Sequence, residues 1–161
     1  MNDFDGHLRE IEEWRAVVGK AIVSFGELEL ITQQCLVHLP TDKISETASK
    51  LSFTRRTDLI VEILESWPAP GDEVSRFIEM LKRARKLAET RNHIAHNPVM
   101  MNLFLDHAKR PFAKRGIVSA RGDRLIELEE LKEFADEVED LAATMWLQIA
   151  KVSQNGGRID A

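Results

Sequence analysis

The stretch that decides the fold is EVSRFIEMLKRARKLAETRNHIAHNP, residues 73–98. Its apolar residues recur every three or four positions, as they do along one face of an α-helix that packs against a core. Asp72 is a good N-cap, and Pro98 stops the helix because the residue before a proline avoids the α region. We therefore expect one long helix that ends at His96.

The same spacing of apolar residues extends over most of the chain on both sides of this helix. It predicts a long first helix from about Leu8 to Leu39, a short amphipathic piece at 44–53, a helix at 54–67 capped by Thr54, and a last helix from about Leu128 to Ser153. Short connections between helices favour an antiparallel bundle. The predicted fold class is all-α, with four or five helices.

Between the last two long helices, at about 99–126, the helical spacing breaks down. VMMNLFL at 99–105 and GIVSA at 116–120 have the composition of short strands, and the turn-forming, basic segment HAKRPFAKR separates them. The sequence therefore predicts a small β-hairpin-like insert in this region.

The composition fits a single domain at 1–154, followed by a flexible tail at 155–161. Of the 161 residues, 43% are hydrophobic and 30% are charged, which is enough for one ordinary core. A single cysteine, Cys35, excludes an intramolecular disulfide. The first residues carry no apolar signal region, and no run approaches the length of a membrane span, so we predict a cytoplasmic protein without a membrane partner.

The net charge of −5 is unevenly distributed. Residues 1–75 carry 7 basic and 14 acidic side chains, residues 76–124 carry 12 and 4, and residues 125–161 carry 3 and 9. A basic middle segment attracts phosphates, and its cations are suited to follow an RNA backbone. Opposite charges that face each other across helices explain the uneven distribution equally well. For the basic stretch at 109–124, a solvated hairpin whose edges are protected by charge is an equally good explanation.

Two charged residues fall where apolar side chains are expected. Arg91 lies in the middle of the apolar face of the 73–96 helix, and Glu29 lies on the apolar face of the first helix. An unpaired charge taken out of water is costly, so we predict that Glu29 pairs with Arg91. The pair either fixes the packing of the helices or holds the arginine for a phosphate.

The sequence RNHIAH at 91–96 has an arginine, a polar residue, three further residues and a histidine at the end of a long helix. This pattern resembles the signature of the HEPN superfamily, whose members are short helical bundles. The resemblance implies that Arg91 and His96 are catalytic and that Asn92, at the polar position of the motif, positions the phosphate. The inward-facing Glu29 is then expected to orient Arg91. It also implies a homodimer in which two copies of the motif share a cleft.

The resemblance predicts a metal-independent endoribonuclease of the toxin or antiviral-effector type, with RNA or a nucleotide and a cognate antitoxin or regulatory protein as partners. A histidine can take a proton from a 2′-hydroxyl, and an arginine can stabilise charge on a phosphate. No metal and no cofactor is predicted, because no ligand cluster or phosphate-binding loop is present in the sequence. Two alternatives stay open, a HEPN module that binds RNA or a nucleotide without cleaving it and a helical interaction subunit that resembles an antitoxin.

Overall fold

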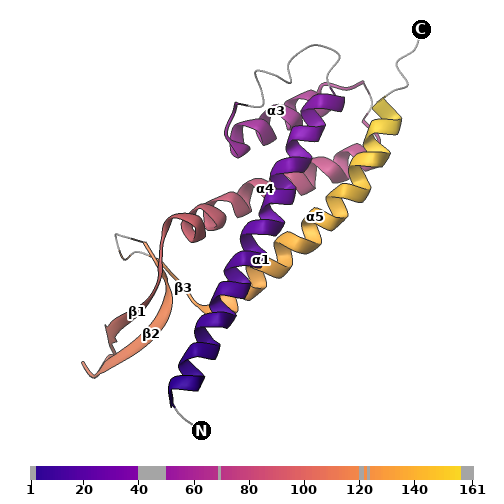
Figure 1. Cartoon of the computed structure of the whole chain (residues 1–161). Helices are drawn as coiled ribbons and strands as arrows, with labels where there is room; N and C mark the ends of the chain where they lie inside the picture. The colour runs from indigo at the N-terminus through magenta and orange to yellow at the C-terminus, as the bar shows by residue number, and fades with distance from the viewer. Residues whose placement is uncertain (1–2, 40–49, 69, 120–121, 123, 157–161) are drawn as a thin grey trace.

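The computed structural model describes residues 3–39, 50–68, 70–119, 122 and 124–156. In these residues the chain is mostly helical and carries a small antiparallel sheet (Figure 1). The helices are α1 (Asp3–His38), α3 (Phe53–Glu65), α4 (Asp72–His96) and α5 (Leu128–Gly156), and the strands are β1 (Val99–Leu105), β2 (Pro111–Val118) and β3 (Leu125–Ile126). None of these helices is both long enough and apolar enough to cross a membrane.

Helices α1 and α5 lie side by side and run in the same direction (Figure 1). Lys20 of α1 contacts Asp136 of α5 at 2.7 Å, and Glu13 of α1 contacts Lys132 of α5 at 2.7 Å, so residue numbers rise together along the two helices. The prediction of an antiparallel all-α bundle is therefore only partly correct. The connection between these two helices contains α3, α4 and the whole sheet. A connection of this length allows α5 to begin beside the N-terminal half of α1.

The core lies among the apolar faces of the four helices. Phe25 of α1 and Phe53 of α3 meet edge to face, with ring centroids 4.9 Å apart. Phe77 of α4 and Met145 of α5 are fully buried in the same cluster. The helical spacing in the sequence thus correctly identified the buried faces, whose removal from water is the main stabilising contribution.

The helix starts differ slightly from the prediction. Ser52, not Thr54, caps α3, and its hydroxyl accepts a hydrogen bond from the backbone N–H of Arg55. Helix α4 begins at Asp72 itself, with Gly71 in the cap position. The short helical piece predicted at 44–53 lies mostly outside the described residues.

The predicted hairpin is present, and a third strand joins it. Strands β1 and β2 pair with Asn102 opposite Lys114, and β3 adds to the other side of β2, so the all-α class is corrected. Strand β2 begins at Pro111, five residues before the predicted Gly116, because Asp106 tightens the turn by accepting hydrogen bonds from two backbone N–H groups. At two residues, β3 is too short to give an alternating pattern.

Gly116 allows β2 and β3 to approach closely. A Cβ atom at this position would lie 2.8 Å from the carbonyl oxygen of Ile126, closer than real Cβ atoms come to such an oxygen. The adjacent Ile117 is fully buried and anchors the sheet in the helical core. The glycine therefore fixes how the hairpin leaves the bundle.

Candidate functional site

The predicted pair between Glu29 and Arg91 is present. Nη2 of Arg91 donates a hydrogen bond to Oε1 of Glu29, and Nη1 donates to Oδ1 of Asn92 at 2.9 Å. The guanidinium also lies over the ring of Phe25, with its carbon 5.0 Å from the ring centroid. The side chains of Arg91 and Glu29 are only 26% and 30% exposed, so this is a partly buried link between α1 and α4.

These contacts engage two of the five guanidinium N–H groups of Arg91, the residue whose charge the HEPN resemblance assigns to a phosphate. A phosphate at Arg91 would compete with the Glu29 carboxylate, which already neutralises the guanidinium. Asn92 is exposed beside Arg91, and His96 is exposed in the last turn of α4. The structure thus brings Glu29, Arg91 and Asn92 together, whereas the participation of His96 stays a prediction.

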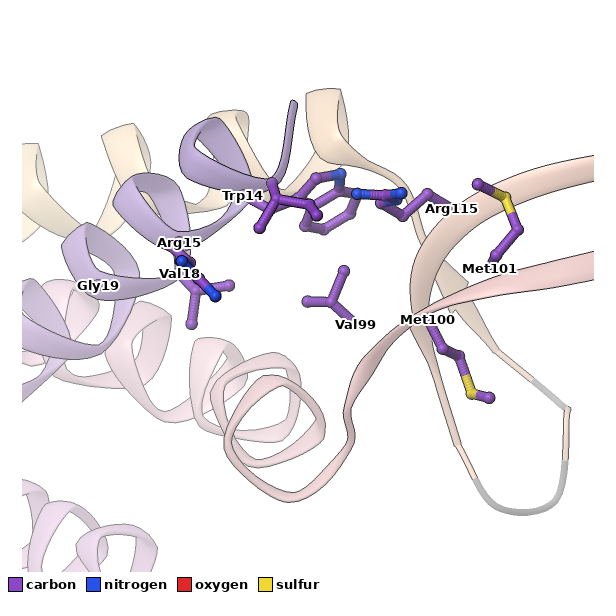
Figure 2. Close-up of a pocket in the computed structure, with 9 residues that line it drawn as sticks. Trp14, Arg15, Val18, Gly19, Val99, Met100, Met101 and Arg115 are labelled. Atoms are coloured by element: carbon purple, nitrogen blue, oxygen red, sulfur yellow. The ribbon is translucent and has the colours of Figure 1, made fainter. Parts of the chain in front are cut away.

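A second candidate site lies where α1 meets the base of the hairpin. A groove of about 560 Å³ separates the two, and Figure 2 shows the side chains that surround it. Its principal lining residues are Trp14, Arg15, Val18, Val99, Met101 and Arg115. We call this space the Trp14 groove, and its volume lies in the range of small-molecule sites.

Arg115 forms the charged wall of the Trp14 groove. Its side chain is only 11% exposed, and Figure 2 shows it beside Trp14. Its Nε lies 3.4 Å from Oε1 of Glu10, and its Nη2 lies 3.1 Å from Nδ1 of His7. Because arginine only donates, His7 must accept through Nδ1. These two residues hold the guanidinium in place without enclosing it.

Arg15 supplies a second cation at the groove. It is exposed on α1, next in sequence to the buried Trp14. Within the described part of the chain, Arg15 has no ion-pair partner. The groove therefore combines a mostly apolar wall, one positioned guanidinium and one unpaired guanidinium.

The other cations of the basic middle segment are mostly neutralised within the chain. Arg110 pairs with Asp106 at 2.8 Å, Lys114 with Glu127 at 2.5 Å, and Arg124 with Glu130 at 3.2 Å. This arrangement matches the solvated hairpin that the sequence left open as the alternative to an RNA-binding track.

Sequence reasoning missed the Trp14 groove. Trp14 is 3% exposed and belongs to the buried face of α1, and the sequence pattern does not single out its neighbour Arg15. Arg115 was assigned to a general basic segment. The signal that could have found the groove is the Trp14-Arg15 pair, because adjacent helical residues face different sides and so mark the edge of a buried face.

Arg56 of α3 is another buried cation that the sequence pattern did not reveal. It is 6% exposed, and its Nη1 donates to the carbonyl oxygen of Leu51 at 2.9 Å while its Nε donates to Thr32 at 3.3 Å. Burial lowers the pKa of Arg56 from its ordinary value. The bond to Thr32 joins α3 to α1, and the bond to Leu51 fixes the segment that leads into α3, so Arg56 has a structural role.

Neither candidate site contains a group of metal ligands. Within the residues that the structure describes, no three His, Cys, Asp or Glu side chains gather where they could hold a metal ion. Cys35 is fully buried in the core, and burial raises the pKa of its thiol to about 12. It is therefore a packing residue at neutral pH and not a thiolate ligand.

Comparison with known proteins gives two distant similarities. Methylglyoxal reductase DkgB of Salmonella typhi is 28% identical over 127 residues, which cover 62% of this chain and 48% of the reductase. The protein of the same name from Salmonella typhimurium strain LT2 is 34% identical over 88 residues, which cover 51% of this chain and 33% of that protein. This chain spans about half or less of the curated relatives it matches. No family model matches it, and no solved structure matches it.

These similarities contradict the endoribonuclease predicted from the sequence. The curated proteins that match are named as reductases, and neither is a ribonuclease or a toxin–antitoxin component. The ribonuclease prediction is therefore wrong.

Proposed function

We propose that this protein binds a small organic anion in the Trp14 groove, with a carboxylate or phosphate group at one end and a flat or branched apolar body. The observation that carries the proposal is the Arg115 guanidinium, held at 11% exposure in the wall of an otherwise mostly apolar groove. Ligand sites commonly combine an apolar lining with a few positioned polar groups.

The two ends of such a ligand match different parts of the groove. A carboxylate or phosphate can accept paired hydrogen bonds from a guanidinium, which is the geometry that arginine favours. The apolar body would cover Trp14, Val18 and Val99 and remove their surfaces from water, at roughly 25 cal/mol per Å² buried. Glu10 and His7 already hold Arg115 in place, so little side-chain entropy is lost when the anion binds.

Arg15 provides the long-range attraction for this ligand. Because it has no ion-pair partner among the described residues, its charge is available to an incoming anion. The exposed charge of Arg15 lines the groove from α1, and the positioned charge of Arg115 lines it from β2. We expect Arg15 to act mainly on the rate of association and Arg115 mainly on the lifetime of the complex.

Calorimetric titration with phenyl phosphate, benzoate and the neutral benzyl alcohol tests the proposal. The two anions should bind and the alcohol should bind at least tenfold more weakly. Arg115→Gln should weaken anion binding by about tenfold, which is about 1.4 kcal/mol. Arg55→Gln is the matched control, because Arg55 is an exposed arginine on α3 away from the groove. Equal binding of the alcohol and the anions would contradict the proposal.

The names of the two relatives support a second candidate function, the reduction of a small carbonyl compound such as methylglyoxal. The specific observation in its favour is the same guanidinium pair, because a carbonyl oxygen accepts hydrogen bonds from arginine. Such a reaction also needs a hydride donor such as a reduced nicotinamide nucleotide. The described strands are all antiparallel, so they do not form the strand, glycine-rich loop and helix of one common type of site for such a nucleotide. We therefore derive no hydride-transfer step from this chain.

A spectrophotometric assay separates the two candidate functions. The purified chain is mixed with methylglyoxal and a reduced nicotinamide nucleotide, and absorbance at the nicotinamide band is followed. Anion binding without turnover supports a binding protein, whereas turnover that Arg115→Gln reduces and Arg55→Gln preserves supports the reductase.

We also propose that the HEPN resemblance reflects a shared helical plan. The support is the position of Arg91 at the end of α4 and its link to Glu29 of α1. In this proposal Arg91 holds the two helices together. The catalytic roles that the resemblance gives to Arg91 and His96, and the positioning role of Asn92, stay predictions.

A further inference from the structure

Among the described residues, strand β1 is an edge strand without the usual protection. It is hydrogen-bonded to β2 on one side, and no other described strand pairs with its second side. Its sequence, VMMNLFL, contains no charged residue and no proline. Leu103 is 80% exposed, Leu105 is 67% exposed and Met101 is 51% exposed.

Soluble proteins usually block such an edge with charge, proline, a bulge or a covering segment. In Figure 1 the hairpin projects away from the helical bundle, so none of the helices covers the free edge of β1. A row of unpaired backbone donors and acceptors beside large exposed apolar side chains is a template for another strand.

We propose that β1 pairs in antiparallel fashion with β1 of a second copy of this chain, about a two-fold axis that passes beside Asn102. The resulting dimer contains one continuous six-stranded antiparallel sheet. The shared strand spans about 23 Å, at roughly 3.3 Å per residue.

The strand is self-complementary in this register. Because Asn102 is the middle residue of β1, Met101 faces Leu103 of the partner subunit and Met100 faces Phe104 of the partner subunit. Every apolar residue of the strand then meets an apolar residue, and the two Asn102 amides meet each other. A register shifted by one residue would place Asn102 opposite an apolar side chain and lose this match.

Charge also permits the pairing. The contact strand is uncharged, and the cations of the neighbouring β2 have anions within their own chain, as the Lys114 and Arg115 pairs show. Two hairpins therefore approach without strong repulsion. A second copy fits better than a charged peptide, because β1 offers no side-chain charge to select such a peptide.

The dimer would also change the Trp14 groove. Val99 and Met101 line the groove, and residues directly opposite each other in an antiparallel pair lie on the same face of the sheet. Leu103 of the partner subunit would therefore lie beside Met101 and lengthen the apolar wall. The dimer itself does not depend on the groove binding a ligand.

Sedimentation velocity over a range of concentrations tests the dimer. The native chain should sediment with twice the mass of one chain at about 100 µM and partly dissociate on dilution, because the proposed interface is small. Leu103→Lys should give a folded monomer, since it places a charge in the interface. Leu147→Lys is the matched control, because Leu147 is 72% exposed on α5, and it should remain a dimer. A native chain that is monomeric at all concentrations would overturn the proposal.

Cysteine cross-linking tests the register. In Asn102→Cys the two new thiols would face each other at a Cα separation of about 4.5–5.5 Å, which is within disulfide range. Oxidation should therefore convert most of this variant to a covalent dimer. In Leu105→Cys the two thiols would lie far apart along the strand and should not cross-link. Equal cross-linking of the two variants would overturn the proposed register, and Cys35 does not interfere because it is fully buried.

Discussion

The two halves of α1 make the same kind of contact, and the consequences of the two contacts differ. In the C-terminal half, Glu29 holds Arg91 over Phe25, and the contact closes α1 against α4. In the N-terminal half, Glu10 holds Arg115 beside Trp14, and a groove of about 560 Å³ remains next to the guanidinium. Each half thus pairs a glutamate with an arginine next to an aromatic ring.

The difference comes from what packs against each half. Helices α3 and α4 fill the space around Phe25, whereas the hairpin meets the N-terminal half only at its base (Figure 1). Both arginines contact two groups of their own chain, and Arg115 is the more buried of the two, at 11% against 26% exposed. The difference is the open groove, which is lined by Arg115 and not by Arg91. The closed half therefore serves stability, and we assign binding to the open half.

The largest expected contrast between the two regions is in thiol reactivity. Cys35 in the closed half is fully buried, and its pKa is raised to about 12, so its thiol should react only when the chain opens. In Ala108→Cys, the new thiol at the hairpin turn is exposed and should react at once. Labelling kinetics at pH 8 should show Cys35 reacting at least about 1,000-fold more slowly, given ordinary protein stabilities. Comparable labelling rates for the two thiols would mean that the core around Cys35 is open to solvent.

The next largest effect concerns the attachment of the hairpin. Gly116→Ala places a methyl group against the carbonyl oxygen of Ile126, so we expect the free energy of unfolding to fall by about 2 kcal/mol. Hydrogen exchange should locate the loss in β2 and β3, with α4 around Arg91 still protected. Gly26→Ala is the control, because nothing lies near a Cβ at that position of α1. Uniform loss of protection would show that the hairpin and the bundle unfold as one unit.

A smaller loss of stability should follow from opening the closed half. Arg91→Ala leaves the Glu29 carboxylate unpaired and removes the cation from Phe25, which should lower the free energy of unfolding by about 1.5 kcal/mol. Chemical denaturation measures this value. In a double-mutant cycle with Glu29→Gln, the two single losses should add up to more than the double loss. Strictly additive losses would show that the pair is not coupled.

The smallest stability effect is expected in the open half. Arg115→Gln should change the free energy of unfolding by only about 0.5 kcal/mol, because Glu10 is 43% exposed and water can replace the lost partner. The same denaturation experiment, run beside Arg91→Ala, makes the comparison direct. If Arg115→Gln proved more destabilising than Arg91→Ala, Arg115 would be a structural residue and its assignment to a ligand would lose its basis.

The helices and the Glu29–Arg91 pair could be predicted from the sequence because both depend on local periodicity. Apolar residues at helical spacing identify buried faces, and a charge on such a face needs a partner. The parallel arrangement of α1 and α5 was not predictable in this way, because it depends on how a long connection folds back. The same holds for β3, which is too short to carry a pattern.

The Trp14 groove was also beyond local pattern reasoning. Arg15 and Arg115 are 100 positions apart in the chain, and only the tertiary fold brings them to one groove. The motif at 91–96 attracted attention because its residues are adjacent in sequence, yet its arginine is engaged inside the fold. Compact motifs are easier to find than sites assembled from distant segments.

The most direct test of ligand binding in the Trp14 groove uses the three tryptophans as reporters. Trp14 borders the groove, whereas Trp67 and Trp146 do not line it. In proton–nitrogen NMR spectra, titration with phenyl phosphate should shift the indole N–H signal of Trp14 in a saturable way and leave the other two signals in place. A shift of Trp146 without a shift of Trp14, or no saturable shift at all, would contradict the assignment of binding to this groove.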